Sequence, residues 1–225
     1  VICASTMFAS VGRAERPNII MFLIDDQNPS SISAFGGNTY TPNLDSMAEE
    51  GMKFTRAYVS SSVCTPSRYS FLTGRFAGNS HSKLYNGAVG GKENQGLPGF
   101  NVALERDKMN VGHVLREAGY TTGFVGKFHL TSKLDFPEFY KGKNKWINIS
   151  KDSHPGPEAS AKFKHNERWM RRYLKELGFS WAKNVYPENS HKPYSEHNPE
   201  WTTVAALEFI EQNKNGPFYL HLCST

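Results

Sequence analysis

The chain has 225 residues, enough for one sizeable hydrophobic core or two small ones. Its composition, 38% hydrophobic and 21% charged, excludes a disordered or collagen-like chain, and no apolar run is long enough to span a bilayer. The net charge of +5 is mild and the basic residues are mostly scattered, so we expect a solvated basic surface and no nucleic-acid partner.

The first residues resemble the end of a secretory signal peptide. Residues 1–12 carry no charge and are rich in small and apolar side chains, and Gly12 and Ala14 suit the small positions of a cleavage site. A buried first strand is the alternative, but the polar run that follows would break it. We therefore predict a signal-peptide remnant over residues 1–14 and a secreted or periplasmic protein.

The predicted elements alternate between strands and helices. Residues 19–24 form an unbroken apolar run, as in a strand buried on both faces, and residues 42–50 form a helix stopped by Gly51. A second strand is predicted over 53–59, and a helix begins at Cys64 with Pro66 in its first turn. The remaining predictions are helices over 111–118, 166–177 and 199–213, and strands over 121–125 and 218–223.

This alternation predicts an α/β fold in which helices flank a mostly parallel sheet. We expect one domain from residue 16 to residue 225. A buried strand so close to residue 225 leads us to expect that the domain continues beyond it. The three cysteines, Cys3, Cys64 and Cys223, are odd in number and differ in their surroundings, so a disulfide framework is not expected.

Asp25 and Asp26 directly follow the first predicted strand. The carboxyl ends of the strands are where ligands bind in open α/β sheets. Two adjacent carboxylates at a strand end repel each other, and a hard divalent cation would offset that repulsion. The alternative is a pair of loop aspartates that cap a turn.

Cys64 is predicted at a helix start, where backbone N–H groups and the helix dipole favour negative charge. Arg68 lies one turn further along, so its guanidinium can return to the same anion. This arrangement suits sulfate or phosphate. A thiol phosphatase would place its arginine six positions after the cysteine, where this chain has Ser70. A buried structural cysteine beside a surface arginine remains the alternative.

Lys127 and His129 follow the strand predicted over 121–125. In an extended segment they point to the same side, where a fixed cation and a titratable imidazole would face one pocket. A surface lysine and a hydrogen-bonded histidine without a catalytic role are the alternative.

Together these segments resemble the sulfatase family of the alkaline-phosphatase-like superfamily. The resemblance rests on Asp25-Asp26, on Gly119 to Leu130 with its Gly126-Lys127-Phe128-His129 core, and above all on the long pattern Cys64-x-Pro66-Ser67-Arg68-x-x-x-Leu72-Thr73-Gly74-Arg75. It covers the chain from about residue 16 to its end, and it is weak over 77–110 and 132–196.

The resemblance implies that a formylglycine-generating enzyme oxidises Cys64 to formylglycine, whose hydrated form attacks the sulfur of a sulfate ester. It implies a divalent cation, usually Ca²⁺ with Mg²⁺ as the alternative, held by Asp25, Asp26 and the modified Cys64. Arg68 would stabilise the modified residue, Lys127 would bind sulfate and His129 would assist collapse of the diol.

The resemblance also implies that further ligands of the metal and of the sulfate lie beyond residue 225 in the full-length protein. We therefore expect these 225 residues alone to be inactive. The substrate expected is a sulfated carbohydrate or an aryl sulfate. The alternatives are a phosphatase or phosphodiesterase of the same superfamily, a non-catalytic relative that binds sulfated glycans, and a cytosolic thiol enzyme.

Overall fold

The computed structural model describes residues 16–89, 97–143, 145–149, 156–189, 195 and 197–225, so the signal peptide predicted over residues 1–14 lies outside the described residues. A four-stranded sheet of order β1-β4-β2-β3 organises the chain, and every pairing in it is parallel. The predicted α/β fold with a mostly parallel sheet is therefore confirmed. The strands are β1 (Ile19–Ile24), β2 (Thr121–Lys127), β3 (Trp181–Tyr186) and β4 (Phe218–Ser224).

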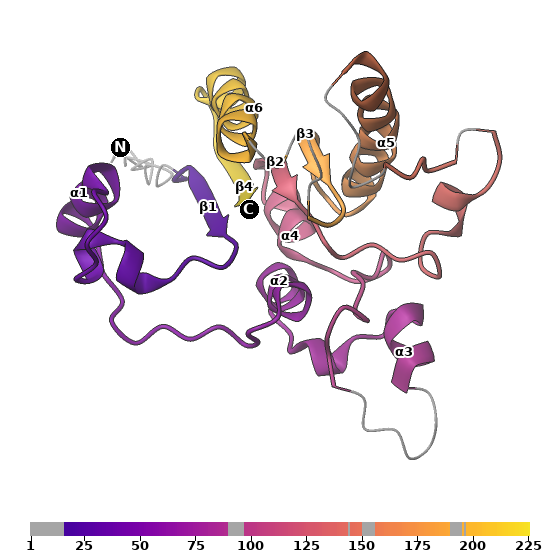
Figure 1. Cartoon of the computed structure of the whole chain (residues 1–225), viewed down its shortest axis with the longest axis horizontal. Helices are drawn as coiled ribbons and strands as arrows, with labels where there is room; N and C mark the ends of the chain where they lie inside the picture. The colour runs from indigo at the N-terminus through magenta and orange to yellow at the C-terminus, as the bar shows by residue number, and fades with distance from the viewer. Residues whose placement is uncertain (1–15, 90–96, 144, 150–155, 190–194, 196) are drawn as a thin grey trace, which may run out of the picture.

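All five predicted helices are present, and α3 is a further helix that was not predicted. The helices are α1 (Pro42–Glu50), α2 (Cys64–Thr73), α3 (Lys83–Val89), α4 (Val111–Glu117), α5 (Pro157–Glu176) and α6 (Asn198–Asn213). The helix predicted over 166–177 begins nine residues earlier than expected, at Pro157, because a proline suits the first turn of a helix. Figure 1 shows α1 beyond β1, away from the rest of the sheet, and α2 close to the strand ends.

Helices cover both faces of the sheet. On one face, Val125 of β2 and Leu220 of β4 pack with Phe209 of α6. On the other face, Phe124 of β2 belongs to a larger core that includes Tyr173 of α5. Successive side chains of β2 thus point to opposite faces, and both faces of this central strand are buried. Because both faces of β2 are buried, each of them carries apolar side chains.

Two strand predictions differ from the structure. Residues 53–59 form no strand, and Phe54 and Tyr58 are exposed, because this segment runs past the sheet without pairing to a neighbour. The sequence pattern of residues 53–59 does not show whether a neighbouring strand is present. Conversely, β3 was not predicted, because Lys183 and Asn184 interrupt its apolar pattern. Within the described part of the chain, no helix combines the length and apolar character needed to cross a bilayer.

Candidate active site

The candidate site lies where the parallel strands end. Asp25 directly follows β1, and its backbone N–H donates to the carbonyl of Ser224 at the end of β4, over 3.0 Å. Lys127 is the last residue of β2. The parallel order therefore brings these strand ends to one edge of the sheet, the edge at which open α/β sheets bind ligands.

Cys64 is the first residue of α2, and its Sγ lies 3.2 Å from Nδ1 of His129. The Lys127 Nζ lies 3.8 Å from the same sulfur. The Cys64 side chain is therefore placed at a helix start, beside one ammonium and one imidazole. That is the environment in which an anionic nucleophile or a bound anion is stabilised.

Arg68 lies one turn along α2 and is only 3% exposed. Its guanidinium donates to the carbonyl of Lys127 over 2.8 Å and lies 3.5 Å from the Asp25 carboxylate. Arg68 Nε and the neighbouring Thr65 Oγ1 are buried without a hydrogen-bond partner among the described residues. Buried polar atoms normally have partners, so these two atoms are candidates to bind a ligand oxygen.

Lys127 is buried as deeply, with 1% of its surface exposed. Its ammonium donates to the carboxylate of Asp25 and to the side-chain oxygen of Asn189. A buried ammonium needs such partners, because an unpaired charge is expensive to remove from water. Asn189 was not singled out in the sequence. It follows β3, so the missed strand also concealed this residue.

The backbone at the end of β2 is irregular. The pairing of β2 with β3 shifts between Val125 and Gly126, and Gly126 has a φ of 90°. A Cβ at Gly126 would collide with the carbonyl oxygen of Cys223, so this position requires glycine. His129 also has a positive φ, 55°, so the segment is not extended as predicted. Lys127 and His129 nevertheless both reach Cys64, because the bulge redirects the chain.

The charges of the site act on its titratable groups. Burial would raise the pKa of the Asp25 carboxyl, but the hydrogen bond from Lys127 and the charge of Arg68 hold it below its ordinary value. Burial, together with the charges of Lys127 and Arg68, lowers the pKa of His129 to about 4. His129 is therefore neutral near pH 7, and its surroundings disfavour the protonated form.

A buried carboxylate holds α2 in place. Glu105 accepts a hydrogen bond from the Tyr69 hydroxyl over 2.9 Å and an ion-paired one from Arg75 over 3.1 Å. Arg75 is the last residue of the long pattern that begins at Cys64, and Tyr69 occupies one of its unspecified positions. Their role in this structure is to anchor the helix that carries Cys64 and Arg68. Glu105 stands alone in the sequence, outside any motif, so the sequence does not predict that it anchors α2.

The metal ligands expected from the resemblance are only partly brought together. Asp25 reaches the centre, but its carboxylate is engaged by Lys127 and Arg68, and Asp26 is exposed with a φ of 58°. Within the described ranges, no group of three or more histidine, cysteine, aspartate or glutamate side chains could hold a metal. The donor chemistry fits a hard cation, since both residues offer carboxylate oxygens, but they make an incomplete ligand set.

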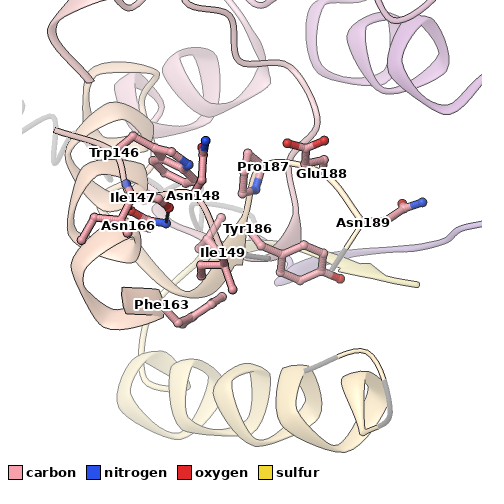
Figure 2. A pocket seen from close by; sticks show the side chains of 11 residues that line it. Trp146, Ile147, Asn148, Ile149, Phe163, Asn166, Tyr186, Pro187, Glu188 and Asn189 are labelled. Carbon is pink, nitrogen blue, oxygen red and sulfur yellow. Dashed lines mark hydrogen bonds between the residues drawn. The ribbon is translucent and has the colours of Figure 1, made fainter. Parts of the chain in front are cut away.

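Two pockets adjoin the centre on either side of the segment after β3. The larger, about 580 Å³, is lined by His129 together with Phe100, Lys133 and Tyr140. The smaller, about 140 Å³, lies between Trp146 and the first half of α5 (Figure 2). Glu188 and Asn189 line both pockets. Cys64 lines neither pocket, but the larger one is lined by His129, whose Nδ1 lies 3.2 Å from the Cys64 sulfur, so it lies next to the centre.

The fold and the centre together define an α/β protein with a cysteine at a helix start beside two buried cations, at the edge where parallel strands end. The family model described as Sulfatase matches residues 17–225, so the chain belongs to the sulfatase family, as the sequence patterns predicted.

Curated relatives agree with this membership. The chain is 37% identical to human (Homo sapiens) arylsulfatase D over 52% of its own length and 19% of that protein's. It is 29% identical to N-acetylgalactosamine-6-sulfatase of Mus musculus over 94% of its own length and 40% of that protein's. The chain therefore spans only about a fifth to two fifths of these two relatives.

Solved structures share the fold. One, described as a sulfatase from glycosaminoglycan metabolism by Bacteroides thetaiotaomicron, has a TM-score of 0.61 at 22% identity and covers 93% of this chain and 51% of its own. Another, in complex with its substrate D-glucosamine-2-N,6-O-disulfate, has a TM-score of 0.54 at 22% identity and covers 93% of this chain and 34% of its own. At this level of identity the likeness establishes the fold alone.

Proposed function

We propose that this protein hydrolyses sulfate esters with a nucleophile built from Cys64. The single observation that carries the proposal is the placement of Cys64 at the start of α2, 3.2 Å from His129 and 3.8 Å from the buried ammonium of Lys127. Membership of the sulfatase family supports it. The chain's cysteine also favours a sulfatase over a phosphatase of the same superfamily, in which serine or threonine would be expected.

We propose that a formylglycine-generating enzyme converts Cys64 to formylglycine, which supplies an oxygen nucleophile in place of the thiol. Arg68 and Lys127 bind the sulfate oxygens and stabilise the charge that develops on them. Arg68 Nε, which has no partner among the described residues, is suited to one of those oxygens. His129 is neutral near pH 7, and its Nδ1 lies 3.2 Å from the Cys64 sulfur, so it is placed to hydrogen-bond the modified residue 64.

Asp25 and Asp26, with residue 64, would hold the divalent cation, Ca²⁺ or Mg²⁺. When bound, this cation supplies Lewis-acid polarisation of a sulfate oxygen. Lys127, whose ammonium also lies beside Asp25, would contact sulfate. The support is the pair of carboxylates at the strand end, one of which already lies beside Arg68 and Lys127.

The larger pocket suits the alcohol part of the ester. Phe100 stacks at a tilt over His129, with ring centroids 5.4 Å apart, and Lys133 lies 5.3 Å above the Tyr140 ring. Aromatic faces beside polar side chains favour a sugar ring over a plain aryl group. We therefore propose a sulfated carbohydrate as the substrate class, and a site of action outside the cytoplasm, as residues 1–14 predict.

The test uses the full-length gene product, made with and without a formylglycine-generating enzyme. We expect the peptide that contains Cys64 to show the aldehyde mass, and sulfate to be released from 4-nitrophenyl sulfate and from sugar sulfates. Cys64→Ala is the matched control and should abolish release while leaving the circular dichroism spectrum unchanged.

Three outcomes would overturn the proposal. The first is unmodified thiol with no sulfate release from any ester. The second is faster release of phosphate from 4-nitrophenyl phosphate than of sulfate from its sulfate analogue, which identifies a phosphatase. The third is full activity in Cys64→Ala, which would place the nucleophile elsewhere.

A further inference from the structure

The outer face of α5 carries an unusual density of positive charge. The helix has six cations and three carboxylates, so its charge is 6 − 3 = +3 of the chain's +5. At about 100° per residue, five of the cations fall within a sector of roughly 100°, opposite the buried side of the helix. We call this the basic stripe, and its members are Lys164, Arg168, Arg171, Arg172 and Lys175.

The charges in the basic stripe repel one another. Lys164 and Arg168, Arg168 and Arg172, and Arg171 and Lys175 are each four residues apart, the spacing at which like charges destabilise a helix. An ordinary solvated face would place carboxylates at these positions. Among the described residues, none of Lys164, Arg168 and Lys175 forms an ion pair. An anion bound along the stripe would relieve this repulsion.

Two carboxylates flank the stripe without neutralising it. Arg171 lies 3.5 Å from Glu167, but Glu167 also accepts the backbone N–H of Asn184. Arg172 lies 3.7 Å from Glu176, which is already engaged by Arg106. The side chain of Arg172 is 65% exposed, so its charge faces solvent. The carboxylates therefore hold the edges of the stripe and leave its centre positive.

The surface is hollowed on both sides of Arg172. One hollow, of about 250 Å³, is lined by His165, Arg168, Trp169 and Arg172. The other, of about 440 Å³, is lined by Arg171, Arg172 and Lys175 of the stripe together with Trp181 of β3. Lys183 and Glu208 also line this hollow, and they pair with each other and leave the three stripe cations in excess. Both hollows thus combine cations with an indole ring. This combination suits a ligand made of rings that carry anionic groups, because the cations bind the anionic groups and the indole stacks on the apolar faces of the rings.

We propose that the basic stripe is a binding site for an anionic polysaccharide, separate from the active site. The stripe extends about 16 Å along the helix, from Lys164 to Lys175, so it matches an extended chain better than a single small anion. Trp169 lies beside Arg172, whose guanidinium sits 5.7 Å from the indole centroid. A stacking ring among spaced arginines favours a sulfated or carboxylated glycan over a lipid surface.

The stripe lies apart from the reaction centre. The second hollow includes Ser180 and Trp181 at the beginning of β3, whereas Cys64 lies at the edge where the strands end. A glycan held along α5 would keep the protein on a polymer without occupying the catalytic pocket. The inference does not require turnover, so it can be tested by binding alone.

The experiment measures binding of the full-length gene product to dextran sulfate, at several salt concentrations around 0.15 M, with unsulfated dextran as the neutral control. The variant Arg168→Glu/Arg172→Glu should bind at least tenfold more weakly. The dependence of its log Kd on log salt should be shallower by roughly two, because two contacts to the polyanion are lost. Lys108→Glu/Lys214→Glu makes the same change of charge elsewhere and should bind like the wild type.

Hyaluronan, a DNA duplex and vesicles with anionic lipid complete the comparison. Tighter binding to dextran sulfate or hyaluronan than to DNA or vesicles supports the proposal. Tighter binding to DNA or to vesicles would overturn it, as would equal weakening in both double variants. If the glutamate variant does not fold, Arg168→Gln/Arg172→Gln replaces it, and unchanged binding in that variant overturns the proposal.

Discussion

Arg68 donates a hydrogen bond of 2.8 Å to the carbonyl oxygen of Lys127, which joins the first turns of α2 to the end of β2. The two residues carry the two buried cations of the centre, and both contact the carboxylate of Asp25. Their charges would repel each other without that carboxylate. The arrangement therefore depends on three segments of the chain at once.

Arg68→Lys keeps the charge but removes the planar fork that reaches Asp25 and the Lys127 carbonyl. We expect sulfate release to fall by about 10²-fold or more, the loss typical of a removed transition-state donor. Arg68→Ala should in addition lower the free energy of unfolding, by about 3–5 kcal/mol if this buried ion pair is typical. Urea unfolding and initial rates measure the two effects.

Arg75→Lys is the matched control for Arg68, since Arg75 lies two residues after the end of α2 and is paired to Glu105. It should weaken the helix anchor and leave the chemistry nearly unchanged. Full activity in Arg68→Lys would show that the guanidinium takes no part in the reaction.

Asn189→Ala removes one acceptor from the Lys127 ammonium. Hydrogen bonds to charged groups contribute about 1.5–3 kcal/mol, so kcat/KM should fall between about ten- and a hundredfold. The measurement is kcat/KM for 4-nitrophenyl sulfate. Asn148→Ala, in the smaller pocket, is the control and should have little effect. Equal losses in both variants would argue that Asn189 acts only through general packing.

Gly126→Ala should destabilise the protein strongly, because the new Cβ meets the Cys223 carbonyl and the φ is 90°. Gly142→Ala is matched in φ, at 80°, but has open space around its Cβ position. The control should lose about 1–2 kcal/mol, the usual cost of the left-handed region, and Gly126→Ala clearly more. Similar losses of unfolding free energy in the two variants would contradict the role of the close contact.

Stability should fall on acidification because of His221. This imidazole is buried in β4, accepts or donates at Nδ1 with the Tyr219 hydroxyl over 2.7 Å, and stacks on Phe124. Burial, aided by the charge of Arg68, lowers its pKa to about 3. The unfolded state therefore binds a proton more readily than the folded state.

The contribution of His221 is complete above its unfolded pKa, about 6.5, and is lost progressively as pH falls from there towards 3. Within that window the slope from this group approaches about 1.4 kcal/mol per pH unit. Urea unfolding of wild type and His221→Gln at several pH values measures it. An identical pH dependence in both proteins would show that His221 does not control acid stability.

The sequence alone determined the family, the strands before Asp25 and Lys127, and the helix that begins at Cys64. These features are local: an apolar run bounded by polar residues predicts a strand, and a long motif predicts the residues of the centre. The prediction that the strand over residues 19–24 is buried on both faces is wrong, because β1 is an edge strand of the described sheet and Ile20 and Phe22 are exposed on one side of it. The same local evidence failed for residues 53–59 and for β3. A strand is fixed by its neighbours in the sheet, and pattern alone does not show whether a neighbour is present.

Only the tertiary structure decided which hydrogen bonds and ion pairs the candidate residues form. It placed Asn189 on the Lys127 ammonium and Glu105 under α2, and it left Asp26 exposed. It also extended the helix predicted over 166–177 back to Pro157 and left its basic residues exposed. Partners that lie 60 or more residues apart, such as Cys64 and His129, meet only because parallel strands end at a common edge of the sheet.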